Sequence, residues 1–478
     1  MMKSTCRPAG RALGPDHMFR LEFDRGTILV HGDRATVAEL KLPGCAFDRR
    51  VSLYRAPARH YREIITRLAD RGLPYRDDAR SYGKLELSFQ SDRSPFPYQQ
   101  EAVDAWWQAG GRGVVVLPTG AGKTFVALMA MARVQRGTLV IVPTIDLMQQ
   151  WYGVISSQFD IEVGLIGGGY YDVAPVAVST YDSAYLHMER FGHRFGLVIF
   201  DECHHLPGPS YLMTADLSLA PYRLGLTATL EREDGAEHQL KDAIGETVYR
   251  QEIRALSGEY LSGYETIKIS VRLSPEERAE YQEERNAYRA FLDRHRISLS
   301  GPNGWVRFLA ATSRSEEGRR AFTAYRTQKA IAQGSQAKLR VLERLIRQHR
   351  RDRMLVFTSD NETVYRISRR FLIPAITHQT KVKERQELLA AFNAGEYPFL
   401  VTSRVLNEGV DVPEANVAVV LSGSGSVREH VQRLGRILRR VEGKHAILYE
   451  LVAEQTGEEY ASSRRRQHSA YRKAPEGR

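Results

Sequence analysis

Residues 117–124 read Leu-Pro-Thr-Gly-Ala-Gly-Lys-Thr and come directly after three consecutive valines. A buried strand followed by a glycine turn and a helix starting near Thr124 would aim backbone N–H groups at one spot, which makes a cradle for phosphate. Lys123 is then expected to reach the β and γ phosphates of a nucleotide, and the Thr124 hydroxyl to hold Mg²⁺. The other residues of the cradle are Thr119, Gly120, Ala121 and Gly122. ATP and Mg²⁺ are therefore the expected cofactors, although Leu117 stands where this pattern usually has glycine.

Two adjacent carboxylates, Asp201 and Glu202, follow the apolar run at residues 197–200. Because neighbouring side chains at a strand end point in different directions, Asp201 can hold the metal ion while Glu202 faces the terminal phosphate. Glu202 is then the expected general base that activates water. Together with the phosphate cradle, this pair of acids predicts ATP hydrolysis.

Apolar runs that alternate with helical patterns predict a single sheet that carries both the phosphate cradle and the pair of acids. The predicted strands are at residues 113–117, 138–142, 175–178, 196–200 and 223–226. This alternation indicates a doubly wound α/β domain at residues 91–250, in which ligands gather at the carboxyl ends of the strands. A second alternation, with strands at residues 353–358, 398–402, 417–421 and 446–451, indicates another α/β domain at residues 335–461 that has no P-loop of its own.

The remaining segments differ in composition from the two α/β domains. A small α+β domain is expected at residues 18–90, where a helix near residues 61–69 follows strand-like segments. Residues 251–334 are expected to form a linker and a helical insertion, because residues 274–277 are a capping box that opens a highly charged helix. Residues 1–17 are expected to be a flexible leader and residues 462–478 a basic tail.

Composition limits the partners and the compartment. A formal net charge of +11 over 478 residues favours a polyanionic partner, most simply nucleic acid. The three cysteines are too few and too scattered for a disulfide framework or a zinc site, which favours a reducing, cytoplasmic setting. The N-terminal residues lack the apolar core of a signal peptide, and no apolar run reaches a membrane-spanning length, so no membrane association is expected.

The chemical groups occur in an order that resembles the superfamily 2 helicases of the DExH form. Lys123-Thr124 resembles motif I of that family, and residues 201–204, Asp-Glu-Cys-His, resemble motif II. The other matching segments are Tyr98-Gln99 (Q region), Thr180-Tyr181 (a nucleic-acid contact motif), and residues 226–229, 356–358, 407–411 and 432–439 (motifs III to VI). The resemblance implies two RecA-like domains. It also implies nucleotide contacts from Gln99, Gly409 and Asp411, and nucleic-acid contacts from Thr180, Arg232, Thr358 and Thr402.

A second domain can complete the catalytic site with positive charge. One domain encloses the transferred phosphoryl group only partly, and guanidinium groups brought from another domain would stabilise its charge and exclude water. Arg436 and Arg439 are three residues apart, so both face one side of a helix, and Gln432 lies one turn earlier on that face. These three residues are the expected catalytic contribution of the second domain.

Within the superfamily, the chain most resembles the archaeal and bacterial members of the XPB family. Residues 232–234, Arg-Glu-Asp, resemble an XPB triplet linked to unwinding, the helical insertion resembles the XPB thumb, and residues 47–62 resemble its damage-recognition domain. The resemblance implies an ATP-dependent helicase or translocase that acts on duplex or forked DNA in repair. A nuclease or another repair protein is the implied partner.

Three alternatives fit the same motifs. One is a translocase that moves on duplex DNA without separating strands, since separation needs a wedge for which only Arg232, Trp305 and Phe308 are candidates. Another is a DNA-stimulated ATPase that acts as a clamp, whose turnover would not depend on DNA length. The third is an RNA helicase, because motor contacts go mostly to phosphates and carry little information about the sugar.

Overall fold

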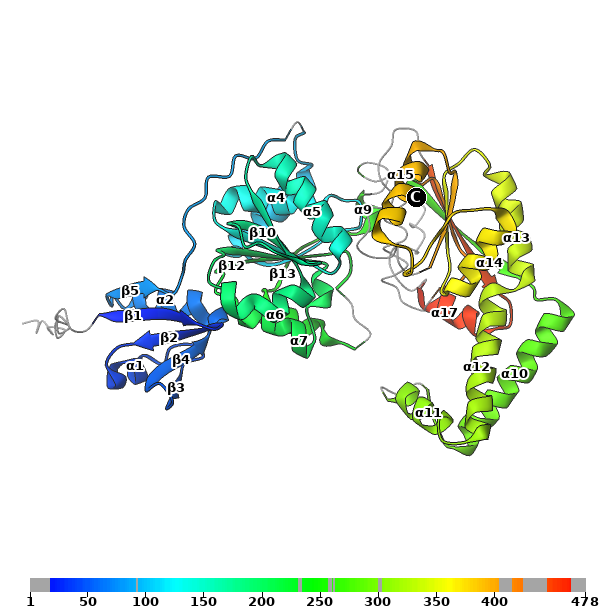
Figure 1. The fold of residues 1–478 in the computed structure, drawn as a ribbon, viewed down its shortest axis with the longest axis horizontal. Coiled ribbons are helices and arrows are strands. Elements are labelled where there is room, and N and C mark those ends of the chain that lie inside the picture. The colour runs from blue at the N-terminus through cyan, green and yellow to red at the C-terminus, as the bar shows by residue number, and fades with distance from the viewer. Residues whose placement is uncertain are drawn as a thin grey trace, which may run out of the picture. The chain divides into compact units, whose positions relative to one another are not determined.

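The structure, a computed structural model, describes residues 18–91, 93–230, 234–256, 260, 263–299, 303–403, 415–423 and 445–465. They divide into two compact units, one containing residues 18–116 and 122–250 and the other containing residues 117–121 and those from 251 onward (Figure 1). Within the described parts of the chain, no helix is long and apolar enough to cross a membrane.

The first unit begins with a small five-stranded sheet in the order β3-β4-β2-β1-β5. Its elements are β1 (Phe19–Asp24), β2 (Thr27–His31), α1 (Arg34–Leu40), β3 (Ala46–Asp48), β4 (Leu53–Pro57), α2 (Tyr61–Asp70) and β5 (Tyr75–Asp78). A tight turn at Arg25 and Gly26, both with positive φ, joins β1 to β2. Phe19 and Leu21 then face the buried side of α2, where Ile64 lies, so the sheet and the helix share one core.

This small domain packs directly on the α/β domain that follows it. Leu219, which precedes the strand β12 (Tyr222–Thr227), belongs to the same apolar core as the small domain. Arg59 donates to Asp216 Oδ1 at 2.9 Å across the junction, and Phe23 stacks on His193. The small domain and the first α/β domain are therefore one continuously packed unit.

The α/β domain has an eight-stranded sheet in the order β13-β6-β12-β11-β7-β10-β8-β9. Its strands are β6 (Arg112–Val116), β7 (Thr138–Val142), β8 (Val163–Gly167), β9 (Tyr170–Tyr171), β10 (Val176–Thr180), β11 (Leu197–Asp201), β12 and β13 (Thr247–Arg250). All pairs are parallel except β8 with β9. The helices are α3 (Pro97–Gln108), α4 (Lys123–Val134), α5 (Ile145–Gln158), α6 (Tyr181–Phe191), α7 (Pro209–Asp216) and α8 (Gln239–Ala243). Helices α4 and α5 cover one face of the sheet, and α6 and α7 cover the other (Figure 1).

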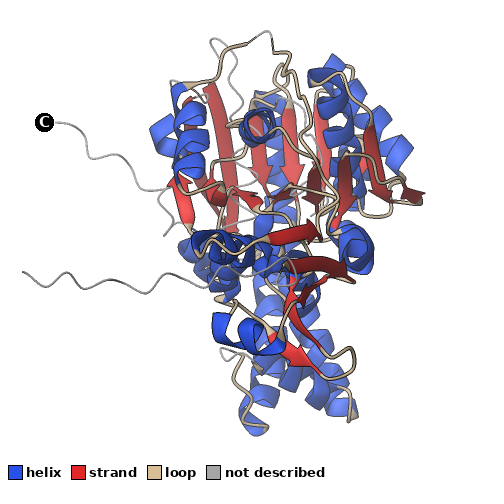
Figure 2. Ribbon diagram, turned by 90° about the vertical axis from the view of Figure 1, so that its left-hand side faces the viewer, coloured by secondary structure: helices blue, strands red, loops and turns tan. Residues whose placement is uncertain are grey.

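The second unit has a six-stranded parallel sheet in the order β14-β19-β18-β15-β17-β16. Its strands are β14 (Gly263–Val271), β15 (Met354–Phe357), β16 (Ala375–Ile376), β17 (Phe399–Thr402), β18 (Val417–Val420) and β19 (His445–Ala453). The helices around them are α9 (Ile253–Leu256), α13 (Gln336–Gln348), α14 (Asn361–Phe371), α15 (Val382–Ala394) and α17 (Gly457–Arg465). In a perpendicular view of the whole chain, helices again lie beside strands (Figure 2). The α/β class with doubly wound parallel sheets is thus confirmed, whereas strand β14 was not expected from the sequence.

Three helices between β14 and β15 form the helical insertion. They are α10 (Pro275–Arg294), α11 (Gly304–Thr312) and α12 (Glu316–Gly334), and α10 lies along α12 with α11 at the far end of the pair (Figure 1). The Ser274 hydroxyl accepts from Glu277 N while the Glu277 carboxylate accepts from Ser274 N, so the predicted capping box is present. Phe308 is fully buried against Phe291, which makes it a core residue and not an exposed wedge, whereas Trp305 remains 42% exposed.

A buried ion pair anchors the second sheet. The Lys338 side chain, which is 0% exposed, donates from Nζ to the Leu421 carbonyl at 2.7 Å and to Glu458 Oε2 at 2.5 Å. We expect Lys338→Ala to lower the free energy of unfolding by about 3 kcal/mol, because the Glu458 carboxylate and a carbonyl lose this cation where little water can replace it.

Urea unfolding followed by circular dichroism measures this loss, and Arg347→Ala is the matched control. Arg347 pairs with Glu343 one helical turn away, but its side chain is 75% exposed, so its loss should change stability by less than about 0.5 kcal/mol. Equal changes in the free energy of unfolding would show that the buried pair contributes no more to stability than the exposed one.

Candidate active site

A glycine turn joins the end of β6 to the start of α4. Gly120 and Gly122 have φ values of 87° and 77°, a left-handed conformation that strains any residue with a Cβ. A Cβ on Gly122 would also lie 2.4 Å from Nε2 of Gln99, so the turn has no room for a side chain there. The backbone is therefore left bare at the N-terminus of α4, as a phosphate cradle requires.

Gln99 fixes the wall of this cradle. It lies in the first turn of α3, is almost fully buried, and its Oε1 accepts a hydrogen bond from Phe96 N at 3.0 Å. The same carboxamide therefore caps a helix and packs against the glycine turn through Nε2. Its predicted contact with adenine stays a prediction.

Lys123 and Glu202 lie together although 79 positions separate them in the sequence. Lys123 Nζ is 3.5 Å from Glu202 Oε1, and the two side chains are only 11% and 13% exposed. Glu202 has a φ of 46°, a left-handed conformation that is uncommon for a residue other than glycine. This backbone conformation turns the carboxylate away from β11 and toward the lysine.

Asp201 is the last residue of β11, and its carboxylate is held on both oxygens. Oδ2 accepts from Trp151 Nε1 at 2.8 Å, and Oδ1 accepts from Glu202 N at 3.0 Å. The pKa of Asp201 is raised to about 6, mainly by burial and also by the Glu202 carboxylate, while Lys123 and the hydrogen bond from Trp151 act in the opposite direction. A buried oxygen donor with its charge incompletely compensated suits a hard divalent cation, so the donor set fits Mg²⁺.

His204 connects this strand end to the next strand. Its Nδ1 is 2.9 Å from Thr227 Oγ1, and the Thr227 hydroxyl donates to Thr229 O at 2.8 Å. Because the hydroxyl proton is used in that bond, Nδ1 of His204 is assigned as the donor to Thr227. Nδ1 also lies 3.4 Å from Glu202 Oε2, so one imidazole lies beside both the predicted general base and the last residue of β12.

Two residues around the carboxylates were not predicted from the sequence. Trp151 comes from the middle of α5, and Tyr181, at the start of α6, donates to the backbone carbonyl of Asp201 at 3.1 Å. Helix α5 follows β7, which lies beside β11 in the sheet, and α6 follows β10, which is the next strand after β7. A search for hydrogen-bonding aromatic residues just after neighbouring strands would have found them.

The threonines that were predicted to contact nucleic acid are buried. Thr180 caps α6 through Ser183 N, the Thr358 hydroxyl donates to Asp360 O, and the Thr402 hydroxyl donates to Ser403 O. Their hydroxyls are therefore already engaged within the chain. Their roles in nucleic-acid binding stay predictions.

Several predicted site residues lie outside the described residues. They are Arg232, Gly409, Asp411, Gln432, Arg436 and Arg439. Their assignments rest on the sequence alone and stay predictions.

Family models match three regions of the chain, which correspond to the small domain and the two α/β domains. Residues 92–232 match "Type III restriction enzyme, res subunit", and residues 337–441 match "Helicase conserved C-terminal domain". Residues 21–79 match "Xeroderma pigmentosum group B helicase damage recognition domain". With the phosphate cradle and the paired acids, these matches define a helicase-type ATPase with two RecA-like domains.

Relatives narrow the class to one family. The chain is 39% identical to the "DNA 3'-5' translocase XPB2" of Sulfurisphaera tokodaii, over 86% of this chain and 96% of that protein. It is 37% and 35% identical to the "DNA 3'-5' helicase XPB" of Kineococcus radiotolerans and of Mycobacterium tuberculosis, over 77% of this chain and 62% of each bacterial protein. The chain belongs to the XPB family. It spans less than two thirds of the length of these two bacterial relatives.

The indole N–H of Trp151 suggests a substitution that tests the carboxylate site. Trp151→Phe keeps an aromatic ring but removes the hydrogen bond that orients Asp201. We expect the Mg²⁺ concentration for half-maximal ATPase activity to rise about tenfold, since groups that orient metal ligands affect metal affinity on that scale.

A Mg²⁺ titration of the ATPase rate measures this effect, with Trp107→Phe as the control. Trp107 stacks on Tyr222 at the start of β12, at the opposite end of the sheet from Asp201. A rise of the same size in both variants would mean that any tryptophan loss disturbs the domain, and would remove the special role of Trp151.

Proposed function

We propose that the chain is an ATP- and Mg²⁺-dependent motor that moves along DNA and separates its strands. The single observation that carries the proposal is the pairing of Lys123 with Glu202 beside a bare glycine turn. A lysine, an acid pair and a phosphate cradle in one place serve phosphoryl transfer, and a purely structural ion pair has no need of the cradle.

The residues divide the chemistry among them. When bound, ATP supplies the phosphoryl group and Mg²⁺ supplies positive charge at its oxygens. Thr124 and Asp201 would hold the metal ion, and Lys123 would neutralise the phosphates. Glu202 accepts the proton of the attacking water, and the His204 ring lies beside its carboxylate, with Nδ1 3.4 Å from Oε2.

DNA is the proposed track. The named relatives are DNA translocases and helicases, and the net charge of +11 favours a polyanion. The proposed setting is DNA repair, with a nuclease or another repair protein as the partner that the resemblance to the XPB family implies, in the reducing, cytoplasmic compartment that the three scattered cysteines favour.

The catalytic assignment predicts two different defects. Lys123→Ala should weaken nucleotide binding, because it removes the counter-charge of the phosphates. Glu202→Gln should keep nucleotide binding within about threefold but lower turnover at least about a hundredfold, because the amide cannot accept the proton.

Binding of a fluorescent ATP analogue and steady-state ATPase rates separate these defects. Glu162→Gln, which changes an exposed glutamate before β8, is the matched control and should behave as wild type. Full turnover in Glu202→Gln would overturn the general-base assignment.

The proposal that the protein moves along DNA is tested with DNA duplexes of increasing length. ATPase rates with duplex DNA should rise with duplex length and then level off, and RNA should stimulate less. A rate that is independent of length would indicate a clamp, and equal stimulation by RNA would remove the preference for DNA. Forked DNA and triplex-displacement assays then tell strand separation from movement alone.

A further inference from the structure

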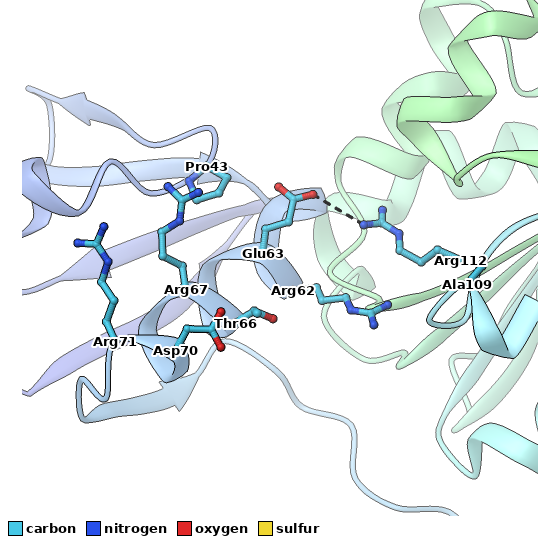
Figure 3. Close-up of a pocket in the computed structure, with 9 residues that line it drawn as sticks. All are labelled: Pro43, Arg62, Glu63, Thr66, Arg67, Asp70, Arg71, Ala109 and Arg112. Carbon is cyan, nitrogen blue, oxygen red and sulfur yellow. Dashed lines mark ion pairs between the residues drawn. The ribbon is translucent and has the colours of Figure 1, made fainter.

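A basic cavity that is open to solvent lies on the surface of the first unit, between α2 of the small domain and the turn that leads into β6. Its volume is about 700 Å³, within the usual range for ligand sites. The residues that line it are Pro43, Arg62, Glu63, Thr66, Arg67, Asp70, Arg71, Ala109 and Arg112. Figure 3 shows the α2 side chains on one side and Arg112 on the other.

Two of the four arginines donate to backbone carbonyls, which carry no net charge. Arg62 donates to the carbonyls of Gly110 and Pro221, and Arg67 donates to the carbonyl of Lys41. Arg71 is exposed. Four arginines and two carboxylates line the cavity, so its net charge is positive.

Arg112 is the least compensated of these cations. Its side chain is only 20% exposed, and in the described part of the chain its buried Nε has no hydrogen-bond partner. The Glu63 carboxylate is 3.9 Å from Nη1, and its other oxygen lies 2.9 Å from His60 Nδ1. Burial lowers the pKa of Arg112, Glu63 opposes this, and Arg62 and Arg59 add to it. Since a guanidinium stays protonated in proteins, this site holds positive charge that calls for an anion.

The cavity is separate from the nucleotide site. Arg112 begins β6 and Val116 ends it, and four strand steps at about 3.3 Å each put roughly 13 Å between their Cα atoms. The glycine turn and Lys123 follow only after Val116. One ligand cannot fill both places.

We infer that this cavity binds a phosphate group, held by Arg112, Arg62 and Arg71 from two sides, with the Thr66 hydroxyl as a further donor. A guanidinium forms paired hydrogen bonds with phosphate oxygens, and a half-buried one binds them more strongly than a surface lysine does. The phosphate belongs either to the DNA backbone or to a small phosphate compound in solution.

Binding is measured without ATP in full-length protein carrying Lys123→Ala, so that the glycine turn contributes little. The probes are inorganic pyrophosphate by calorimetry and a 20-base-pair duplex by fluorescence anisotropy at several KCl concentrations. Arg112→Gln should weaken at least one probe about tenfold or more. Glu63→Gln should tighten the same probe, because it removes the competing carboxylate. Arg49→Gln, an exposed arginine outside the cavity, is the control for charge.

The two probes identify the source of the phosphate. Weaker duplex binding with a salt dependence reduced by about 0.9 per lost contact assigns the site to the DNA backbone. Weaker pyrophosphate binding with unchanged duplex binding assigns it to a small phosphate compound. The inference is overturned if Arg112→Gln matches Arg49→Gln with both probes. If Arg112→Gln does not fold by circular dichroism, Glu63→Gln decides, and unchanged or weaker binding in that variant also overturns it. Either result leaves the ATPase proposal untouched, because no hydrolysis is measured.

Discussion

The ion pair between Lys123 and Glu202 depends on three strands that end side by side. Lys123 follows β6, Glu202 follows β11, and β12 lies between these strands in the sheet. Burying charges is costly unless opposite charges and hydrogen bonds compensate them, so the surrounding side chains must be placed closely. Trp151 secures Asp201, and His204 joins Glu202 to Thr227 at the end of β12. The order of the strands is therefore what brings the catalytic groups together.

Much of this site could be predicted because its main groups are local in sequence. A glycine turn before Lys123 and an acid pair after a strand can each be recognised from a few consecutive residues. The class of the sheet follows from the alternation of apolar runs with helical patterns. Parallel strands also bring their carboxyl ends to one edge, so the meeting of Lys123 with Glu202 was expected before any distance was known.

The remaining features depend on pairings between distant parts of the chain. Trp151 reaches Asp201 because β7 lies beside β11 in the sheet. The amino-acid sequence around either residue does not indicate this strand order. Strand β14 pairs with β19, which lies more than 170 residues later in the chain. The sequence of β14 alone therefore predicted only a part of the linker. The threonines at strand ends are polar by type, and only the packed structure shows that their hydroxyls are engaged within the chain.

The same strands also link the catalytic site to the small N-terminal domain. Arg62 donates to the carbonyls of Gly110 and Pro221, which precede β6 and β12, and the other ends of these strands lead to Lys123 and Thr227. Strands in the interior of a parallel sheet are fully hydrogen-bonded and packed on both faces, so they behave as rigid elements. A displacement at one end of such a strand therefore also displaces the other end. The damage-recognition domain is thus attached to the two strands that carry the lysine and the threonine of the site. A group bound at Arg112 would lie on that attachment, at the end of β6 opposite to the one that leads to Lys123.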